Sequence, residues 1–372
     1  AKELNPNISR VYFNLGLVFE KKRKENLAII NYQKAIDLDP NNFFAFYNLG
    51  SLYKDIYKMK KGEEYLKKSL DLKPDFTNAF INLFDLYDRS NQLKKYEELL
   101  EKAKKALNEK ELIGFYSGMH QYKKKNYKNA IEILENISLK ENNSVQNISK
   151  YGILAKSYDH IKEYDKAFYF FKKNNNLVGN HYGKKINEKN FISYVNQRIE
   201  FFKDLKISRW KNYSIKNDHK DPIFLIGFPR SGTTLLDTIL RTNNSVEVIE
   251  EKPILKNFLI KLEKKTKNDF NQLDNLEEEY ITEMQNFYFQ ERKKYLQNKN
   301  AKFVIDKLPL NIIHIGEIIR FFPNAKFVFA LRHPYDSVLS CFMQQFSLNP
   351  AMKNFLDIQS SSILYDLVMK LW

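Results

Sequence analysis

The chain is poor in several residue types, and each shortage narrows what it can be. Its 372 residues include one cysteine, Cys341, so no internal disulfide can form, which favours a reducing compartment such as the cytoplasm. The 6 histidines form no HxxxH pattern and no cluster with cysteine, so a metal site has no support. No apolar run reaches about 18 residues, and the N-terminus lacks the apolar core of a signal peptide. We therefore expect no transmembrane segment.

The charge of the chain is high but uninformative. A net charge of +16 comes from 61 basic and 45 acidic residues. That surplus suits a polyanionic nucleotide or an acidic acceptor, and equally RNA or a membrane surface. Most of the basic residues are Lys, and Lys and Asn are abundant along the whole chain, which a general compositional bias explains as well as function does. We expect no nucleic-acid partner on this ground.

A repeat dominates the first half of the sequence. Asn14-Leu15-Gly16 recurs 34 residues later as Asn48-Leu49-Gly50, and again as Asn82-Leu83-Phe84. The segment Asp37–Pro40 recurs at the same offset as Asp71–Pro74. This pattern resembles the tetratricopeptide repeat (TPR), a pair of helices of 34 residues, rather than an unrelated helical bundle. We expect about five repeats over residues 6–178, with Tyr127 and Tyr164 opening the second helices of two of them.

The resemblance implies an α-solenoid over residues 1–178. Each helix pair cannot bury its apolar face alone, so stacked pairs form a superhelix with a concave groove that can hold a protein or a peptide. The Asn-rich segment 174–180, with Gly179, is a plausible end of the solenoid. Residues 179–220 then read as a helical linker, with apolar positions at helical spacing between residues 186 and 204.

Residues 222–234 are the most informative stretch of the chain. The apolar run Ile223–Ile226 ends at Gly227, and a helical pattern resumes near Thr234. A strand, a tight loop and a helix N-terminus in succession direct backbone N–H groups at one spot, where an anion is expected. Thr233 stands where a nucleotide-triphosphate loop needs Lys, and the strong cation of the loop is Arg230. Asp306 is the one candidate for a carboxylate that would hold Mg²⁺.

This loop resembles that of the sulfotransferases, whose Pro-x-x-Gly-Thr-Thr segment binds the 5′-phosphosulfate of 3′-phosphoadenosine 5′-phosphosulfate (PAPS). The resemblance implies that PAPS is the co-substrate and that no metal is required. It assigns donor binding to five consecutive residues of the loop, namely Arg230, Ser231, Gly232, Thr233 and Thr234.

A second segment carries the same resemblance. The apolar run Lys326–Leu331 is followed by Arg332, and Pro334 suits the first position of a helix that contains Ser340. In sulfotransferases an Arg and a Ser at this separation bind the 3′-phosphate of PAPS. A planar guanidinium and a hydroxyl suit a phosphate dianion.

Two further residues complete the candidate catalytic set with Arg230. Glu251 matches the Gly-Glu segment of tyrosylprotein sulfotransferases and of bacterial sulfotransferases with TPR repeats, where Glu acts as general base. This chain has Ile249 and Glu250 where small residues are usual, so either Glu250 or Glu251 can be the base, and alignment with Pro253 favours Glu251. Lys307 follows an apolar run, where related enzymes place a Lys against the bridging oxygen of the donor.

The sequence therefore predicts a TPR superhelix followed by an α/β P-loop-like domain with a parallel sheet, the sulfotransferase fold, over residues 221–372. Two helices between residues 256 and 299 are expected to cover the sheet. Only 32 residues follow Ser340, so we expect residues 221–372 to be the N-terminal part of a sulfotransferase domain.

The predicted function is transfer of a sulfuryl group from PAPS to a hydroxyl of a protein tyrosine, a glycan or a small molecule recruited near the solenoid. Two alternatives stay open, a non-catalytic TPR scaffold that binds nucleotide and a P-loop kinase. The kinase would require Mg²⁺ and a triphosphate.

Overall fold

The chain changes from paired helices to a mixed α/β pattern partway along its length. The computed structural model describes residues 8–140, 144–186, 190–203, 210, 220–267, 269–298 and 300–372. It divides into two compact units, Ala1–Asn174 and Asn175–Trp372. Much of the expected connection between residues 208 and 221 lies outside the described residues.

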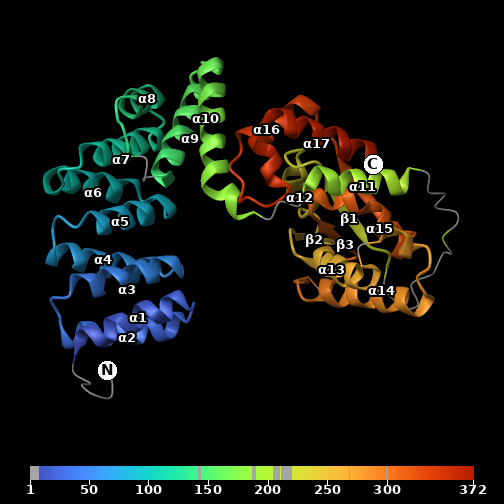
Figure 1. Ribbon diagram of the computed structural model, residues 1–372, viewed down its shortest axis with the longest axis horizontal. Coiled ribbons are helices and arrows are strands. Elements are labelled where there is room, and N and C mark those ends of the chain that lie inside the picture. The colour runs from blue at the N-terminus through green and yellow to red at the C-terminus, as the bar shows by residue number, and fades with distance from the viewer. Residues whose placement is uncertain are drawn as a thin grey trace. The chain divides into compact units, whose positions relative to one another are not determined.

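The first unit consists of antiparallel helix pairs that follow one another along the chain (Figure 1). Within the described residues they can be grouped into five successive pairs, and the last helix runs past Asn174, where the first unit ends. Their bounds are α1 (Ser9–Lys21), α2 (Glu25–Leu38), α3 (Phe43–Asp55), α4 (Met59–Leu72), α5 (Thr77–Arg89), α6 (Leu93–Ala106), α7 (Lys110–Lys123), α8 (Tyr127–Glu135), α9 (Ser144–His160) and α10 (Tyr164–Tyr182).

The recurring glycine of the repeat marks the closest approach of the two helices of a pair. A Cβ placed on Gly50 of α3 would lie 2.9 Å from the backbone nitrogen of Leu66 on α4. A Cβ on Gly118 of α7 would lie 2.4 Å from the side chain of Leu134 on α8. Only glycine leaves room for the partner helix to pack so closely, through its backbone at Gly50 and through a leucine side chain at Gly118. In the third pair Phe84 takes this position, and its ring stacks on Tyr116 of the next pair at 4.1 Å.

The Asn-rich segment does not end the last of these helices, because α10 continues through Gly179 to Tyr182. Asn174 and Asn175 are buried, and their side chains donate hydrogen bonds to the backbone oxygens of Ile148 and Phe342. Buried amides that are satisfied in this way do not compete with the helix backbone, so the helix continues through this segment.

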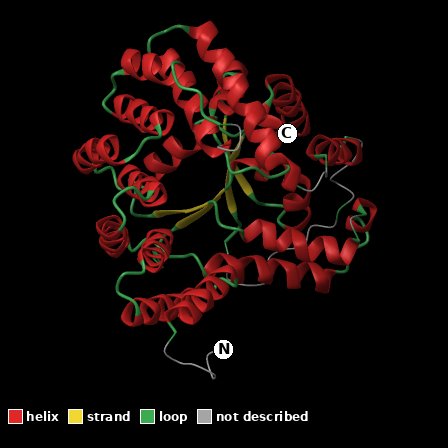
Figure 2. Ribbon diagram, turned by 60° about the vertical axis from the view of Figure 1, so that its left-hand side comes forward, coloured by secondary structure: helices red, strands yellow, loops and turns green. Residues whose placement is uncertain are grey.

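The second unit is built on a parallel sheet, shown as yellow arrows in Figure 2. In the described part of the chain the sheet has four strands in the order β2-β3-β1-β4. The strands are β1 (Ile223–Gly227), β2 (Val246–Glu250), β3 (Phe303–Lys307) and β4 (Lys326–Ala330). The helices are α11 (Phe191–Phe202), α12 (Thr233–Leu240), α13 (Ile254–Thr266), α14 (Glu278–Lys293), α15 (Ile315–Phe321), α16 (Pro334–Met343) and α17 (Ile358–Leu371). Short 3₁₀ helices are η1 (Gly183–Lys185), η3 (Phe270–Leu273), η4 (Pro309–His314) and η5 (Met352–Leu356).

The two faces of this sheet are covered unequally. On one face Phe224 and Ile226 of β1 join a large apolar core with residues of α13, α14 and α17. On the other face Leu225 joins a smaller cluster, against which Leu236 and Leu240 of α12 pack. The predicted pair of helices between residues 256 and 299 is thus confirmed as α13 and α14, and the carboxyl ends of the parallel strands converge at one edge.

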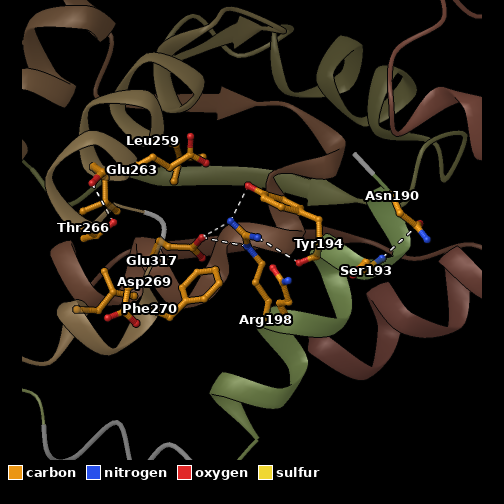
Figure 3. Close-up of a pocket in the computed structure, with 13 residues that line it drawn as sticks. Asn190, Ser193, Tyr194, Arg198, Leu259, Glu263, Thr266, Asp269, Phe270 and Glu317 are labelled. Atoms are coloured by element: carbon orange, nitrogen blue, oxygen red, sulfur yellow. Dashed lines mark hydrogen bonds and ion pairs between the residues drawn. The ribbon is translucent and has the colours of Figure 1, made fainter. Parts of the chain in front are cut away.

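Helix α11 is attached to this core by a buried ion pair (Figure 3). The Arg198 guanidinium contacts Glu317 of α15 at 2.7 Å, and both side chains are almost fully buried. Val195, one turn earlier, is fully buried in the large core. The helix expected between residues 186 and 204 is therefore observed as α11, and it belongs to the second unit.

Two structural observations concern the expected reducing compartment and the expected lack of a transmembrane segment. Cys341 is buried, and its thiol donates to the backbone oxygen of Pro229. The reducing compartment inferred from this single cysteine stays a prediction. Among the helices of the described residues, none combines the length and apolarity needed to cross a bilayer.

The core contains one carboxyl group whose environment favours the neutral form. Asp306 of β3 is 1% exposed, and the Tyr288 hydroxyl donates to its Oδ2 at 3.2 Å. No partner reaches Oδ1 among the described residues. Burial raises the pKa of Asp306 from 3.8 to about 7, against smaller opposing effects of Tyr288 and Arg292. Its stabilising contribution is therefore full below pH 3.8 and is lost as the pH rises through about 7.

We predict that Asp306→Asn removes this pH dependence, because the amide keeps an acceptor for Tyr288 and cannot ionise. Relative to the variant, the wild-type chain should lose roughly 1–4 kcal/mol of unfolding free energy between pH 4 and pH 8. Urea unfolding followed by the fluorescence of Trp210 and Trp372, both in the second unit, measures the difference. Asp366→Asn, on the exposed surface, is the control, and parallel pH profiles for wild type and Asp306→Asn would contradict the assignment.

Candidate active site

The loop after β1 turns sharply at a proline and an arginine. Ser231 N–H donates to the Phe228 carbonyl at 3.1 Å, which closes a turn over residues 228–231. Pro229 occupies its second position and Arg230, with φ +68°, its third, as in a type II turn. Glycine or asparagine normally takes a positive φ at this position, so the turn holds Arg230 in a conformation that costs free energy.

The loop ends on the N-terminus of α12. Gly232 precedes this helix with φ +98°, and Thr233 and Thr234 are its first residues. The first-turn amides of a helix have no acceptor within the helix and carry its positive dipole end. Ser231 beside them is buried, and its hydroxyl has no hydrogen-bond partner among the described residues. An unsatisfied hydroxyl next to free amides suits an anionic ligand.

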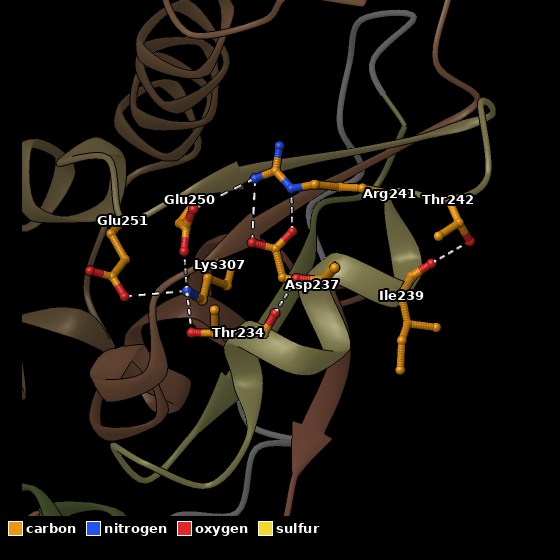
Figure 4. Close-up of polar contacts among 9 residues, drawn as sticks. Thr234, Asp237, Ile239, Arg241, Thr242, Glu250, Glu251 and Lys307 are labelled. Carbon is orange, nitrogen blue, oxygen red and sulfur yellow. Dashed lines mark hydrogen bonds and ion pairs between the residues drawn. The ribbon is translucent and has the colours of Figure 1, made fainter. Parts of the chain in front are cut away.

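A buried ammonium lies at the centre of the site. Lys307 ends β3 and its side chain is 0% exposed. Its Nζ is 2.7 Å from Glu250 Oε1, 3.3 Å from Glu251 Oε1 and 3.5 Å from Thr234 Oγ1 (Figure 4). A buried charge is tolerated only when it is paired in this way. Lys307 therefore connects β3, the end of β2 and the first turn of α12.

The two adjacent glutamates have different surroundings. Glu250 is the last residue of β2. Its hydrogen bond with Lys307 lowers its pKa, and the smaller opposing effect of partial burial does not cancel this. Its other oxygen lies 4.0 Å from Arg241, which pairs with Asp237. Glu251 has φ +50°, and its N–H donates to the Lys307 carbonyl at 2.8 Å. This kink turns the chain, so that Glu251 and not Glu250 lines the cavity described below.

The residues after β4 close the other side of the loop. Arg230 Nε donates to the Ser340 hydroxyl of α16 at 3.0 Å. Arg332 Nη1 donates to the Arg230 carbonyl at 3.3 Å, and Arg332 Nε lies 3.5 Å from Asp336. Sequence spacing singled out Arg332 and Ser340 as a pair. Both residues contact Arg230 of the first loop, from which each is separated by more than 100 positions.

These segments surround one cavity of about 400 Å³. Its lining residues come from the loops after β1, β2, β3 and β4, from the first turns of α12 and η4, and from the segment after α16 that includes the start of η5. They are Pro229, Arg230, Gly232, Thr233, Thr234, Glu251, Leu308, Pro309, Leu310, Arg332, Phe346 and Met352. Ser231 and Lys307 lie directly behind this lining, in contact with it through the backbone and Thr234.

Some members of the site have no signal in the sequence. Phe346 and Met352 come from the segment that follows α16, where no motif is recognisable. The Asp237–Arg241 pair supports Glu250 from α12, and only its spacing of four on one helix hints at a contact. Asp306, the candidate magnesium ligand, is instead buried against Tyr288 of α14, in the apolar core. Its position is therefore unsuitable for a metal beside the loop.

Comparison with known families agrees with a repeat region followed by an α/β domain. A model described as "Sulfotransferase family" matches residues 222–369. Models described as "TPR repeat" and "Tetratricopeptide repeat" match residues 26–56 and 45–76. The chain carries a sulfotransferase-family domain behind TPR repeats. Among the described residues no group of three or more His, Cys, Asp or Glu side chains is arranged to hold a metal ion.

The individual proteins that resemble this chain match only about half of its length. An uncharacterized protein of Aquifex aeolicus (strain VF5) is 30% identical over 209 residues, which cover 55% of this chain and 27% of that protein. The chain thus matches about a quarter of the length of this curated relative. Among solved structures, MamA is 22% identical, with 48% of this chain and 96% of that chain covered and a TM-score of 0.38. YrrB, described as a TPR protein with an unusual peptide-binding site, is 19% identical, with 48% and 91% covered and a TM-score of 0.38.

We predict that Gly227→Ala disrupts the loop. The added Cβ would lie 2.7 Å from the Ala330 carbonyl and 2.7 Å from the Ser231 hydroxyl, so β1 and β4 would have to separate. The unfolding free energy of the second unit should fall by about 1–3 kcal/mol. Gly183→Ala is the matched control, because its Cβ would meet nothing within 4 Å. Urea titrations in which both variants unfold at the wild-type midpoint would contradict the close contact.

Proposed function

We propose that the chain transfers a sulfuryl group from PAPS to the hydroxyl of an acceptor. The observation that carries the proposal is the convergence of Arg230, Arg332, Glu251 and the first turn of α12 on one cavity, with the buried Lys307 behind them. The family match of residues 222–369 supports sulfuryl transfer in general. The donor, the acceptor and the role of the repeats are parts of the proposal.

The loop and its neighbours fit a donor with two phosphate groups. The amides of Gly232 and Thr233 and the unpartnered Ser231 hydroxyl would hold the 5′-phosphosulfate end. Arg332 and Ser340, which meet the loop from β4 and α16, would hold the 3′-phosphate. PAPS supplies an activated sulfuryl group whose leaving group is a phosphate.

Proton transfer falls to Glu251. Its carboxylate lines the cavity, so it can accept the proton of an acceptor hydroxyl as that oxygen bonds to sulfur. Lys307, 3.3 Å from Glu251, lies where it can offset negative charge on the departing phosphate, and Arg230 can do the same for the sulfuryl oxygens. Glu250 keeps Lys307 in place through the shorter contact of 2.7 Å. By analogy with phosphoryl transfer, positioning and charge account for most of the catalysis.

The acceptor proposal rests on the repeats. A solenoid of stacked helix pairs has a groove in which an extended peptide fits. We propose that the first unit recruits a polypeptide, and that the acceptor is a tyrosine or a glycan that this polypeptide carries.

We predict a division of roles between two residues. Glu251→Gln should lower transfer of radiolabelled sulfate from PAPS by about 10²–10⁴-fold, while binding of the bisphosphate product stays within about twofold of wild type. Arg332→Ala should weaken product binding by roughly 10–100-fold, because it removes charge-assisted hydrogen bonds. Titration calorimetry and transfer to lysate proteins measure the two quantities.

Glu250→Gln is the matched comparison for this experiment, since it alters the adjacent carboxylate, which holds Lys307 and does not line the cavity. Loss of transfer in Glu250→Gln with activity kept in Glu251→Gln would reverse the assignment of the base. Product binding without any transfer by the wild-type chain would favour a scaffold that binds nucleotide. Transfer from ATP that needs Mg²⁺ would favour a kinase.

A further inference from the structure

A second cavity in the Asn175–Trp372 unit shares no lining residue with the proposed donor site. It has a volume of about 380 Å³ and lies among α11, α13, η3 and α15 (Figure 3). Its apolar wall consists of Leu259, Leu262 and Leu273. This volume is in the range of small-molecule sites, and a mainly apolar lining with a few polar groups is typical of them.

One carboxylate in the wall is only half satisfied. Three donors converge on Oε1 of Glu317, with Arg198 Nε at 3.0 Å, Arg198 Nη2 at 2.7 Å and His314 Nδ1 at 3.3 Å. No donor among the described residues reaches Oε2, although Glu317 is 2% exposed. A buried carboxylate oxygen without a donor is costly, so this wall of the cavity favours a ligand that brings an N–H group.

The guanidinium in the wall does not serve an anion. Beyond its bonds to Glu317, Arg198 donates from Nη1 to the Tyr194 carbonyl and from Nη2 to the Tyr194 hydroxyl. The rings of Tyr194 and Phe270 lie 3.6 Å and 4.9 Å from its central carbon. The N–H groups of Arg198 thus donate within the protein, and aromatic rings pack against its guanidinium plane. Little of its positive charge is therefore available to a ligand in the cavity.

The charge that remains in the lining is negative. Glu263 and Asp269 line the cavity with Glu317, so three carboxylates oppose one guanidinium. Burial would raise the pKa of Glu317, but the charge of Arg198 and the hydrogen bond from His314 outweigh it and hold the pKa at about 2. Burial lowers the pKa of His314, which therefore adds no positive charge at neutral pH.

We propose that this cavity binds a small organic amine, with its ammonium group between Glu263 and Glu317 and its apolar body against the leucines and the ring of Phe270. The proposal is independent of the sulfotransferase function. An ammonium supplies the donor that Glu317 Oε2 lacks and compensates the surplus of carboxylates. The apolar wall accounts for an amine with a hydrocarbon or aromatic body rather than a metal cation.

The test uses phenethylamine as the probe and the full chain as the protein. Titration calorimetry at low salt should give saturable binding with a Kd below about 1 mM. The neutral isostere 2-phenylethanol should not compete, because it lacks the ammonium. Glu263→Gln should weaken binding by about tenfold or more, since one charged partner is removed.

Glu200→Gln is the matched control, because Glu200 is an exposed carboxylate of α11 that does not line the cavity. Glu317→Gln is a poorer variant, since it leaves Arg198 buried without its carboxylate and destabilises the unit. Wild-type affinity in Glu200→Gln, together with loss in Glu263→Gln, supports the proposal. Absence of binding, equal affinity for the alcohol, or equal affinity of Glu263→Gln overturns it. Binding of the bisphosphate nucleotide by Glu263→Gln should stay unchanged, which separates this site from the proposed donor site.

Discussion

The position of one buried ammonium group determines the geometry of the candidate active site. Lys307 is fully buried, so its positive charge has to be balanced by Glu250 and Glu251. Its Nζ also contacts the hydroxyl of Thr234. These contacts hold the carboxyl ends of β2 and β3 and the start of α12 in one arrangement. The parallel sheet makes this possible, because the ends of all its strands lie at the same edge.

The buried carboxyl groups of the second unit show how partners decide protonation. Asp306 and Glu317 are both almost completely buried, and burial alone raises the pKa of each. Among the described residues Asp306 accepts a hydrogen bond only from Tyr288, which does not offset the effect of burial, so its pKa stays raised at about 7. Glu317 meets the Arg198 guanidinium, so its pKa falls to about 2. The first is mainly neutral below about pH 7, and the second keeps a charge that its surroundings have to accommodate.

Local patterns in the sequence predict much of the fold and of the site. The 34-residue spacing predicts the helix pairs because the first, second and fourth pairs repeat the same close contact at a glycine, as at Gly50. The loop after β1 is predictable because its Gly, Pro and Thr residues act through backbone geometry over a few positions. Tertiary contacts explain the features that the sequence does not predict. Asn174 and Asn175 stay in a helix because distant carbonyls satisfy them, and the Arg198–Glu317 pair joins elements 119 positions apart. The choice between Glu250 and Glu251 depends on a kink with φ +50° that residue type does not indicate.

The proposed donor site requires that the loop amides, Arg230 and Arg332 together bind a nucleotide that carries both a 5′- and a 3′-phosphate. The decisive experiment is a crystal structure of the chain grown with 3′-phosphoadenosine 5′-phosphate. We expect density for one phosphate at the turn around Ser231 and for the other within hydrogen-bond distance of Arg332 and Ser340. An empty turn, with Arg332 directed away from the nucleotide or the nucleotide bound elsewhere, would contradict it.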